Sequence, residues 1–218
     1  MASDEKETTQ YWDQFYKEQK LGIEDIPSQF GVFVCSEFSN RATIVDVGCG
    51  SGRDSFFFAR HFPEVIGIDG SASAINFCNQ KKNTLNVNNT NFKRIDLSEN
   101  ESTSQFFDKT LKEQENTLIY ARFFIHAIDE ITEINFLKIA GIAAKNGASI
   151  AVEFRTLRDK LQPKETDQHY RRYVDPFDFI EKARLQELRV TYFVEGFGFA
   201  KYRNDDAHIA RLILVKNE

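Results

Sequence analysis

A turn with three glycines is the part of this chain whose residue types and spacing best fit binding chemistry. The run Thr43–Val47, rich in β-branched residues, ends in Gly48, Gly50 and Gly52, and the helix-compatible residues 54–60 follow. This order predicts a strand, a tight turn and a helix. Glycines at alternate positions let the backbone bend and approach a ligand, and the free N–H groups of a new helix favour a negative group. The segment is therefore predicted to be a ligand-binding turn.

The spacing of these glycines indicates which ligand the turn takes. A dinucleotide turn, Gly-x-Gly-x-x-Gly, needs its third glycine at position 53 or 55, where the chain has Arg53 and Ser55. Asp46 stands two residues before Gly48. Its carboxylate suits a ligand with an ammonium group, such as S-adenosylmethionine, better than a phosphate. A nicotinamide-dependent oxidoreductase shares the expected fold and stays an alternative.

A second acidic residue follows the next predicted strand. Residues 64–68 read as a strand that runs into Asp69, 21 residues after Gly48, close to the spacing of an acid that hydrogen-bonds a ribose diol. Gly70 and Ser71 then read as a turn and as the N-cap of the helix that follows.

A third acidic residue, Asp96, follows a third predicted strand, residues 91–95, and precedes Leu97. Each of these carboxylates alone is typical of a helix cap or a solvated loop. Ligands of parallel sheets bind at the carboxyl ends of the strands, and the acids occupy three successive strand ends. We therefore expect Asp46, Asp69 and Asp96 to meet in one cleft.

In these motifs the chain resembles the class I, Rossmann-like methyltransferases that use S-adenosylmethionine, whose first motif is Asp-x-Gly-x-Gly-x-Gly. The resemblance implies that Asp46 binds the ammonium of this cofactor and Arg53 its carboxylate. It also implies that Asp69 binds the ribose and that Asp96 and Leu97 contact the adenine, with S-adenosylhomocysteine as the product. The cofactor-binding residues expected on this basis are Asp46, Gly48, Gly50, Gly52, Arg53, Asp69, Gly70, Ser71, Asp96, Leu97, Arg122, Phe123, Tyr11, Trp12 and Tyr16.

Two later strand ends supply candidates for catalysis. The fourth strand leads to Arg122 and His126, and the fifth leads to Arg155. The fourth strand end lacks the Asn-Pro-Pro-Tyr or Asp-Pro-Pro-Phe clamp that amino-methylating nucleic-acid enzymes use on a flipped base, which argues against nucleobase methylation by that route. His126 is the first candidate for general base, because an unperturbed imidazole pKa of about 6.5 suits proton acceptance. A core or capping histidine is the alternative.

A long polar insert, residues 156–174, precedes the next predicted helix and contains the run Gln168–Tyr173. Its guanidinium and phenol groups suit an anionic substrate, and a solvated loop is the alternative. Arg155 is expected to point inward from its strand end, and an ion pair with Glu153 or another acid is its alternative role. The candidate substrate-binding residues are Arg155, Tyr170, Arg171 and Arg172, and the candidate catalytic residues are His126, His169 and Arg155.

The N-terminal segment carries an aromatic cluster that includes Tyr11, Trp12 and Tyr16. At helical spacing these side chains form one broad apolar face, and ordinary packing onto the sheet is the simplest interpretation. In related small-molecule methyltransferases a leading helix of this type folds over the cofactor. The resemblance therefore makes these three residues candidates for a lid that excludes water from the sulfonium.

Composition excludes several classes of protein. The formal net charge of −5 and the pI of about 5.5 argue against a broad nucleic-acid footprint. Cys35, Cys49 and Cys78 lack C-x-x-C spacing, so neither a disulfide framework nor a metal site is expected. The N-terminus lacks a signal-peptide core, and no apolar run is long enough to cross a membrane. We expect a cytoplasmic protein without membrane or nucleic-acid partners.

The alternation of strands and helices predicts one α/β domain over residues 1–218, with a helical cap at 1–40 and a Rossmann-like core at 41–218. We expect a doubly wound, mostly parallel sheet of seven strands with an antiparallel edge hairpin. Strands are expected at 43–47, 64–68, 91–95, Thr117–Tyr120, Ser149–Glu153, Leu188–Glu195 and Ile209–Val215. Helices are expected at Thr9–Gln19, Ser28–Phe38, 54–60, Ala72–Lys81, Ser104–Gln114, Glu130–Lys145 and Asp175–Gln186.

Weaker patterns along nearly the whole chain resemble a bacterial group of methyltransferases associated with capsule or surface polysaccharides. They include Tyr11–Tyr16, Arg122–His126 and Glu195–Tyr202. One departure is Asp205–His208, where the group has an acidic pair followed by proline; this places the loop before the last strand in doubt. The resemblance implies methyl transfer by in-line displacement to an oxygen or nitrogen of a small acceptor, such as a sugar, a nucleotide-linked or phosphorylated metabolite, or a glycan precursor. A catalytically silent binding module is the alternative, and monomer and homodimer both remain open.

Overall fold

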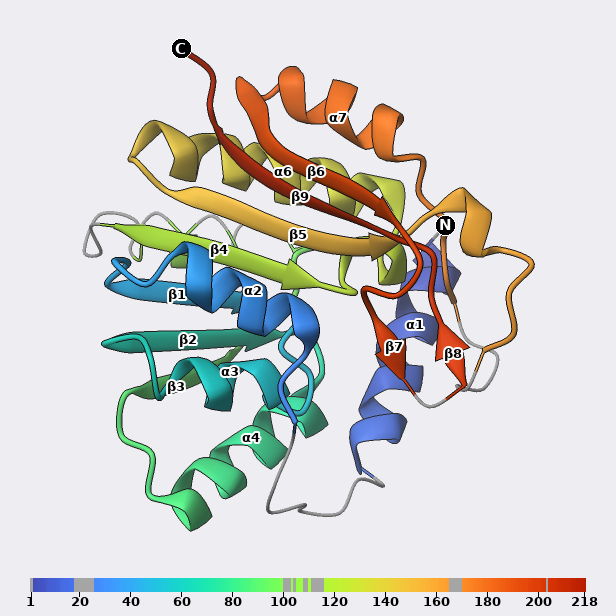
Figure 1. Ribbon diagram of the computed structural model, residues 1–218. Helices are drawn as coiled ribbons and strands as arrows, with labels where there is room; N and C mark the ends of the chain where they lie inside the picture. The colour runs from blue at the N-terminus through green and yellow to red at the C-terminus, as the bar shows by residue number, and fades with distance from the viewer. Residues whose placement is uncertain are drawn as a thin grey trace.

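A seven-stranded sheet runs through the centre of the computed structural model, which describes residues 2–17, 26–99, 103, 105–107, 110, 116–164, 170–202 and 204–218 (Figure 1). Its strands are β1 (Thr43–Val47), β2 (Glu64–Asp69), β3 (Thr90–Arg94), β4 (Thr117–Arg122), β5 (Ser149–Arg155), β6 (Leu188–Gly196) and β9 (Ile209–Lys216).

The strand order is β3-β2-β1-β4-β5-β9-β6. The strands from β3 to β5 are parallel to one another, and β9 lies antiparallel between β5 and β6. The predicted mostly parallel sheet with an antiparallel pair at one edge is therefore confirmed.

Helices cover both faces of the sheet, so the predicted doubly wound arrangement is also confirmed (Figure 1). The adjacent residues Ile44 and Val45 of β1 point to opposite faces. Ile44 belongs to an apolar cluster with Phe30, whereas Val45 belongs to a cluster with Phe136. The helices are α1 (Ala2–Lys17), α2 (Gln29–Glu37), α3 (Arg53–Phe58), α4 (Ala72–Leu85), α6 (Glu130–Lys145) and α7 (Pro176–Arg184), with 3-10 turns η1 (Ile125–Ala127) and η2 (Leu157–Asp159).

Side-chain caps begin several helices where the sequence predicts. Ser71 caps α4, Asp129 caps α6, and Asp175 caps α7 with Pro176 in its first turn. Each cap accepts a hydrogen bond from a backbone N–H that the helix itself leaves without a partner. As a result, α6 spans the predicted Glu130–Lys145.

Other boundaries differ from the prediction. α1 begins at Ala2, earlier than the expected Thr9, and is described as far as Lys17, so its expected end at Gln19 lies outside the described residues. α4 continues four residues beyond Lys81 and ends where Asn86 adopts the left-handed conformation, with a φ of 51°. Of the helix predicted at Ser104–Gln114, the structure describes only residues 105–107 and 110, which are helical.

Between β6 and β9 the chain forms a second, two-stranded sheet that the sequence did not predict. It consists of β7 (Lys201–Tyr202) and β8 (Asp205–Asp206), paired antiparallel. The acidic pair whose conformation was in doubt therefore forms a strand. The Asp206 carboxylate accepts a hydrogen bond from the backbone N–H of Gly198 at 2.7 Å, which fixes the entry to this hairpin.

The carboxyl ends of β1, β2, β4 and β5 lie at the same edge of the sheet because these strands are parallel. Several connections gather there, including the glycine turn after β1 and the insert after β5, which a bridge between Thr156 and Val174 closes. This edge positions the site. Among the described helices, none is long and apolar enough to span a bilayer.

Candidate functional site

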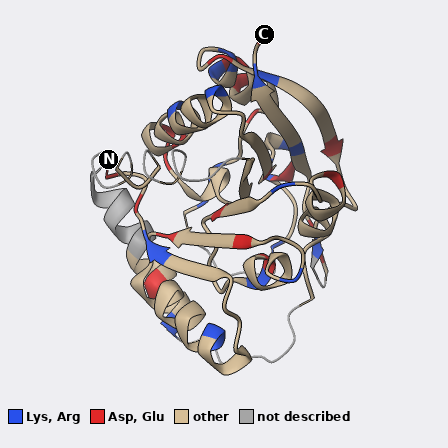
Figure 2. Ribbon diagram, turned by 90° about the vertical axis from the view of Figure 1, so that its left-hand side faces the viewer, with Lys and Arg blue, Asp and Glu red and all other residues tan. Residues whose placement is uncertain are grey.

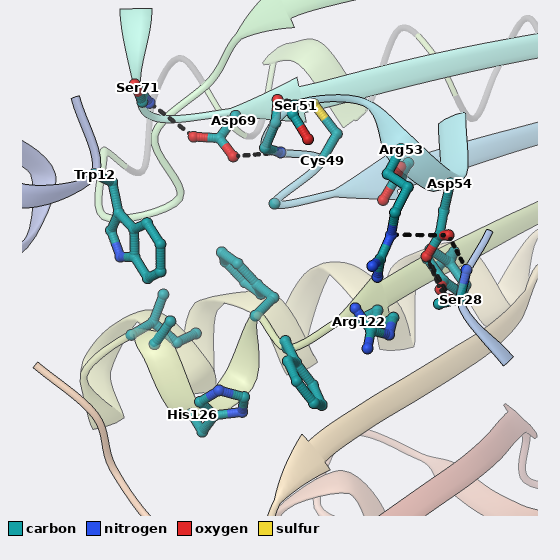
Figure 3. Close-up of a pocket in the computed structure, with 18 of the residues that line it drawn as sticks. Trp12, Ser28, Cys49, Ser51, Arg53, Asp54, Asp69, Ser71, Arg122 and His126 are labelled. Carbon is teal, nitrogen blue, oxygen red and sulfur yellow. Dashed lines mark hydrogen bonds and ion pairs between the residues drawn. The ribbon is translucent and has the colours of Figure 1, made fainter. Parts of the chain in front are cut away.

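A cavity of about 980 Å³ opens at this edge of the sheet (Figure 3). Its volume lies at the upper end of the range usual for ligand sites, about 300–1,000 Å³, which leaves room for two small molecules together. Among the predicted site residues, those that line it are Trp12, Tyr16, Asp46, Gly48, Gly50, Arg53, Asp69, Gly70, Ser71, Asp96, Leu97, Arg122, Phe123, His126, Arg155 and Arg171.

Asp46 lies at the end of β1 and is almost completely buried. Burial raises the pKa of its carboxyl to about 7, and a hydrogen bond donated by the Ser55 hydroxyl at 2.5 Å only partly offsets this effect. A buried carboxylate of this kind is stabilised by a cation in the cavity. Its chemistry therefore fits the ammonium of a zwitterionic ligand.

Asp69 ends β2 and holds the glycine turn in place. One carboxylate oxygen accepts a hydrogen bond from the backbone N–H of Gly50 at 2.9 Å, and the other accepts one from that of Ser71 at 2.8 Å. Burial raises the pKa of this carboxyl, although both hydrogen bonds oppose the shift. Asp69 thus joins the turn to the start of α4.

Asp96 and Leu97 follow β3. The Asp96 carboxylate accepts hydrogen bonds from the backbone N–H and the hydroxyl of Ser98, at 3.0 and 2.7 Å. Leu97 is buried and belongs to the main apolar cluster. Asp46, Asp69 and Asp96 all line the one cavity, so their predicted meeting in a common cleft agrees with the structure.

The glycine turn adopts left-handed backbone conformations that favour glycine. Gly48 has a φ of 69°, and a Cβ there would lie 2.6 Å from the Phe124 ring. Gly50 has a φ of 53°, and a Cβ there would collide with the hydroxyl of Tyr16. Side chains larger than hydrogen would therefore force the walls of the cavity apart.

Asp54, which the sequence analysis did not single out, is the centre of a buried cluster. Its carboxylate accepts hydrogen bonds from the backbone N–H and the hydroxyl of Ser28, at 2.7 and 2.6 Å, and from the Tyr120 hydroxyl at 2.7 Å. Burial opposes ionisation, but the guanidiniums of Arg122 and Arg53 outweigh it and hold the pKa of Asp54 below its usual value. Figure 3 shows Arg53 and Asp54 joined beside Ser28.

Arg122, at the end of β4, belongs to a buried ionic chain. Its Nε donates to Glu153 at 2.9 Å, and the other oxygen of Glu153 accepts from Nε of Arg211 at 2.6 Å. Burial opposes the charge of Arg122, but Glu153 raises its pKa. One carboxylate therefore serves two guanidiniums, and the side chain of Arg122 keeps 17% of its surface exposed at the cavity.

Arg155 lines the cavity but favours the alternative role considered for it, a structural ion pair. Its guanidinium binds Asp159 at 2.7 Å and Asp205 at 2.5 Å, which are acids other than Glu153, as the alternative allowed. Two buried carboxylates neutralise its charge, so the expected roles in catalysis and substrate binding are not supported. The reason is tertiary: β8 brings Asp205 to the end of β5.

His126 also differs from the expected general base. Its Nδ1 accepts a hydrogen bond from the backbone N–H of Arg155 at 3.1 Å. This bond assigns the proton of the neutral imidazole to Nε2, and a protonated nitrogen donates rather than accepts. As placed, the buried ring is a hydrogen-bond donor at the lower side of the cavity in Figure 3.

The polar insert reaches the cavity through Arg171 alone among its described residues. Arg172 binds Glu133 and the backbone oxygen of Ile125 instead, so it joins the insert to α6. Tyr170 is not among the cavity-lining residues, and His169 lies outside the described part of the chain. The expected cluster of substrate-binding residues is therefore dispersed.

Helix α1 contributes Trp12 and Tyr16 to the cavity, together with Phe15. Tyr11 does not line it but packs edge to face on Trp12, with ring centroids 5.1 Å apart. Burial raises the pKa of the Tyr16 hydroxyl well above its ordinary value. The helix lies over the glycine turn, as a lid would.

Several cavity residues gave no signal in the sequence because their elements come together only in the folded chain. Ser28 has the pattern of a helix cap, and Tyr120 that of a core strand residue. The β7–β8 hairpin, which was not predicted, supplies Lys201 and Asp205. The full set of these cavity residues is Ser28, Asp54, Tyr120, Phe124, Thr132, Ala200, Lys201 and Asp205.

The donor set fits S-adenosylmethionine. Asp46 offers a carboxylate in need of a cation, Arg53 offers a guanidinium for a carboxylate, and Asp69 offers a carboxylate for a ribose diol. Among the described residues, no group of three or more His, Cys, Asp or Glu side chains has the arrangement of a metal site.

Fold and site together define a Rossmann-like domain with a large cleft at the carboxyl ends of its strands. Residues 38–178, more than half of the chain, match the family described as "Methyltransferase domain". The chain belongs to this family. This membership replaces the nicotinamide alternative.

Two curated proteins share short stretches with the chain. The 23S rRNA (uracil(1939)-C(5))-methyltransferase RlmD of Pseudoalteromonas translucida is 34% identical over 68 residues, or 31% of this chain. The probable S-adenosylmethionine-dependent methyltransferase CRG1 of Saccharomyces cerevisiae is 40% identical over 43 residues, or 20% of this chain. The aligned part spans 15% of the length of each relative.

Solved structures share the fold over nearly the whole chain. The CcbJ methyltransferase from Streptomyces caelestis has a TM-score of 0.71 at 14% identity, covering 97% of this chain and 99% of that one. A SAM-dependent methyltransferase from Anabaena variabilis has a TM-score of 0.67 at 17% identity, covering 96% and 93%. PKMT2 from Rickettsia typhi, in complex with AdoHcy, has a TM-score of 0.65 at 12% identity, covering 90% and 55%.

Proposed function

We propose that the protein transfers the methyl group of S-adenosylmethionine to an oxygen or nitrogen of a small, anionic acceptor. Sugars, nucleotide-linked sugars and phosphorylated metabolites belong to this class, and capsule or surface-glycan precursors are one source of them. The observation that carries the proposal is the charge of the cavity. Its walls combine three strand-end carboxylates with cationic groups from other elements, among them Arg122, Arg171 and Lys201.

The residues divide into two sets in the proposed mechanism. Asp46 and Arg53 would bind the two charged groups of the methionine part, Asp69 the ribose, and Asp96 with Leu97 the adenine. S-adenosylmethionine, when bound, supplies a methyl group that a sulfonium makes electrophilic. Arg122 and Arg171 would orient the acceptor, since alignment is the main task left to the protein in a direct displacement.

The proton of the acceptor depends on which atom is methylated. A neutral amine has a lone pair and needs no base before transfer, whereas a hydroxyl needs one. His126 is better suited to donate a hydrogen bond to the acceptor, because its Nδ1 is already occupied by Arg155. His169 remains the other candidate base.

Small-molecule acceptors are favoured over RNA by the charge of the chain. The net charge is −5, and Figure 2 shows Lys and Arg interspersed with Asp and Glu along the ribbon. Association with RNA is driven largely by counterions that are released when basic side chains neutralise phosphates. A chain with a net negative charge gains little from this release. Ribosomal RNA, the substrate named for one relative, is therefore the negative arm of the test.

Isothermal titration with S-adenosylhomocysteine tests the cofactor site. We expect micromolar affinity, and Asp69→Ala should weaken it more than tenfold because the variant loses both the ribose contact and the hydrogen bond to Gly50. Glu37→Ala, an exposed carboxylate on α2, is the matched control. Absence of binding by the wild-type protein would refute the cofactor site.

Labelling tests the acceptor. Methyl-labelled S-adenosylmethionine is incubated with nucleotide sugars, phosphorylated metabolites, cell extract and ribosomal RNA, and label is expected in an anionic small molecule. Label in RNA alone would overturn the proposed acceptor class. A protein that binds S-adenosylhomocysteine but labels no arm would be a silent binding module.

A further inference from the structure

Asp13 is a polar residue of α1 that no role described so far uses. One oxygen of its carboxylate accepts hydrogen bonds from the backbone N–H of Ser73 and from the hydroxyl of Ser71, both at 2.9 Å. These donors lie at the start of α4, 58 and 60 residues away along the chain. Asp13 therefore fastens α1 to the N-terminus of another helix.

The electrostatics of this contact are favourable. A helix N-terminus carries partial positive charge and N–H groups without intrahelical partners, so it stabilises a carboxylate. The backbone hydrogen bond from Ser73 is the main reason that the pKa of Asp13 lies below its ordinary value, although burial opposes the shift. The contact is thus charged at neutral pH.

Ser71 connects this contact to the cofactor site. Its hydroxyl donates to Asp13 and accepts from the backbone N–H of Ala74, while its own backbone N–H donates to Asp69. Asp69 in turn accepts from the backbone N–H of Gly50. A continuous chain of hydrogen bonds therefore runs from α1 through the start of α4 to the glycine turn.

The same helix also covers the cavity. Trp12 lies on the side of the cavity where Asp69 and Ser71 are found (Figure 3). Tyr16, three residues after Asp13, packs its hydroxyl end against Gly50. Both ends of the hydrogen-bond chain thus meet α1, once through Asp13 and once through Tyr16.

From this geometry we infer that Asp13 is a positioning residue for cofactor binding. It holds α1 on α4, which keeps Tyr16 over the glycine turn and Ser71 aligned with Asp69. The inference rests on the proposed cofactor roles of Asp69 and the turn. Its consequence is that the loss of Asp13 weakens retention of the cofactor without touching any atom of it.

Three variants test this role. Asp13→Ala removes the acceptor, and Asp13→Asn keeps an acceptor oxygen of the same shape without the charge. Gln10→Ala, an exposed position on α1, is the matched control. Thermal melting first establishes that each variant folds; Asp13 belongs to none of the apolar core clusters, so all three are expected to.

The affinity for S-adenosylhomocysteine is measured by titration and its dissociation rate by stopped flow, with the emission of Trp12, the single tryptophan, as the signal. Asp13→Ala should bind about tenfold more weakly, through faster dissociation, with red-shifted emission in the free protein. Asp13→Asn should fall between Asp13→Ala and the wild type. In turnover, the KM for S-adenosylmethionine should rise while kcat stays within about twofold.

Three results have different meanings. If the wild type binds S-adenosylhomocysteine and folded Asp13→Ala binds it as tightly as Gln10→Ala does, Asp13 has no positioning role. If the wild type itself fails to bind, the proposed cofactor site fails and the inference falls with it. A drop in kcat at saturating cofactor with unchanged affinity would also overturn the role, because it would place Asp13 in the chemistry.

Discussion

Asp46 and Asp54 are both buried at the cavity, yet their partners give them different charge states. Burial raises the pKa of Asp46 to about 7, since a single hydroxyl, that of Ser55, is its main stabilising partner. Arg122 and Arg53 overcome the same effect at Asp54 and lower its pKa. At neutral pH the free protein thus keeps Asp54 ionised, whereas the pKa of Asp46 is raised into the neutral range.

This difference predicts a pH dependence of cofactor binding. A bound ammonium stabilises the ionised form of Asp46 and lowers its pKa, so binding releases a proton below pH 7. The affinity for S-adenosylhomocysteine should therefore rise as the pH increases from about 6 to 8, as titration at several pH values would measure. Asp46→Asn should bind weakly with a flat profile; an equally steep profile in that variant would assign the effect to another group.

At the scale of elements, Asp54 joins three of them. It lies in the first turn of α3, and its carboxylate accepts hydrogen bonds from Ser28 at the start of α2 and from Tyr120 on β4. The arrangement holds α2 against the sheet at the point where the chain leaves the N-terminal segment. A side chain that lines the cavity thus also stabilises the fold.

Asp54→Ala should destabilise the protein by about 3 kcal/mol, because the backbone N–H of Ser28 then loses its acceptor and the Tyr120 hydroxyl keeps only its 3.2 Å hydrogen bond with the Ser28 hydroxyl. Ser28→Ala removes a helix cap and should cost about 1 kcal/mol. Urea unfolding measures both. Ser36→Ala, an exposed position on α2, should stay within about 0.5 kcal/mol of the wild type; equal stability of Asp54→Ala would contradict the joining role.

The β7–β8 hairpin is the second element with a predicted effect. Arg155 binds Asp205 of this hairpin. Lys201 of the same hairpin lines the cavity and forms no ion pair with another residue in the described part of the chain. The ammonium of Lys201 therefore offers a charge to an anionic acceptor, whereas Arg155 is neutralised. We expect acceptor recognition to depend on this hairpin.

Lys201→Ala should raise the KM for the acceptor found by labelling about tenfold, because it removes a cation from the acceptor side. The affinity for S-adenosylhomocysteine should change less than about twofold. Lys216→Ala, an exposed lysine at the end of β9, is the control for steady-state kinetics. Identical acceptor KM values in the two variants would show that Lys201 does not contact the acceptor.

At the scale of the whole molecule, ligand binding and stability are linked. S-adenosylhomocysteine at about 100 times its Kd should stabilise the native state by about 2.7 kcal/mol. For a domain of this size that corresponds to a rise in Tm of about 5–10 °C. Asp69→Ala at the same ligand concentration should show about half of this rise or less, and a full rise in the variant would mean that the ligand binds elsewhere.

Local residue patterns were sufficient to predict most elements. Ser71, Asp129 and Asp175 start helices because their side chains cap nearby N–H groups, an interaction within a few residues. The β7–β8 hairpin escaped prediction because its strands are two residues long and leave no periodic signal.

By itself, the sequence determined the parallel sheet and the place of the cofactor turn, because strand periodicity and glycine spacing are local properties. It also placed Asp46, Asp69 and Asp96 at strand ends, which parallel strands bring to one edge. The tertiary structure alone decided the charge and hydrogen-bonding state of each side chain. Arg155 is neutralised by Asp205, His126 accepts from a neighbouring strand, and Asp13 reaches another helix, since partners 29 to 60 residues away meet only in the folded chain.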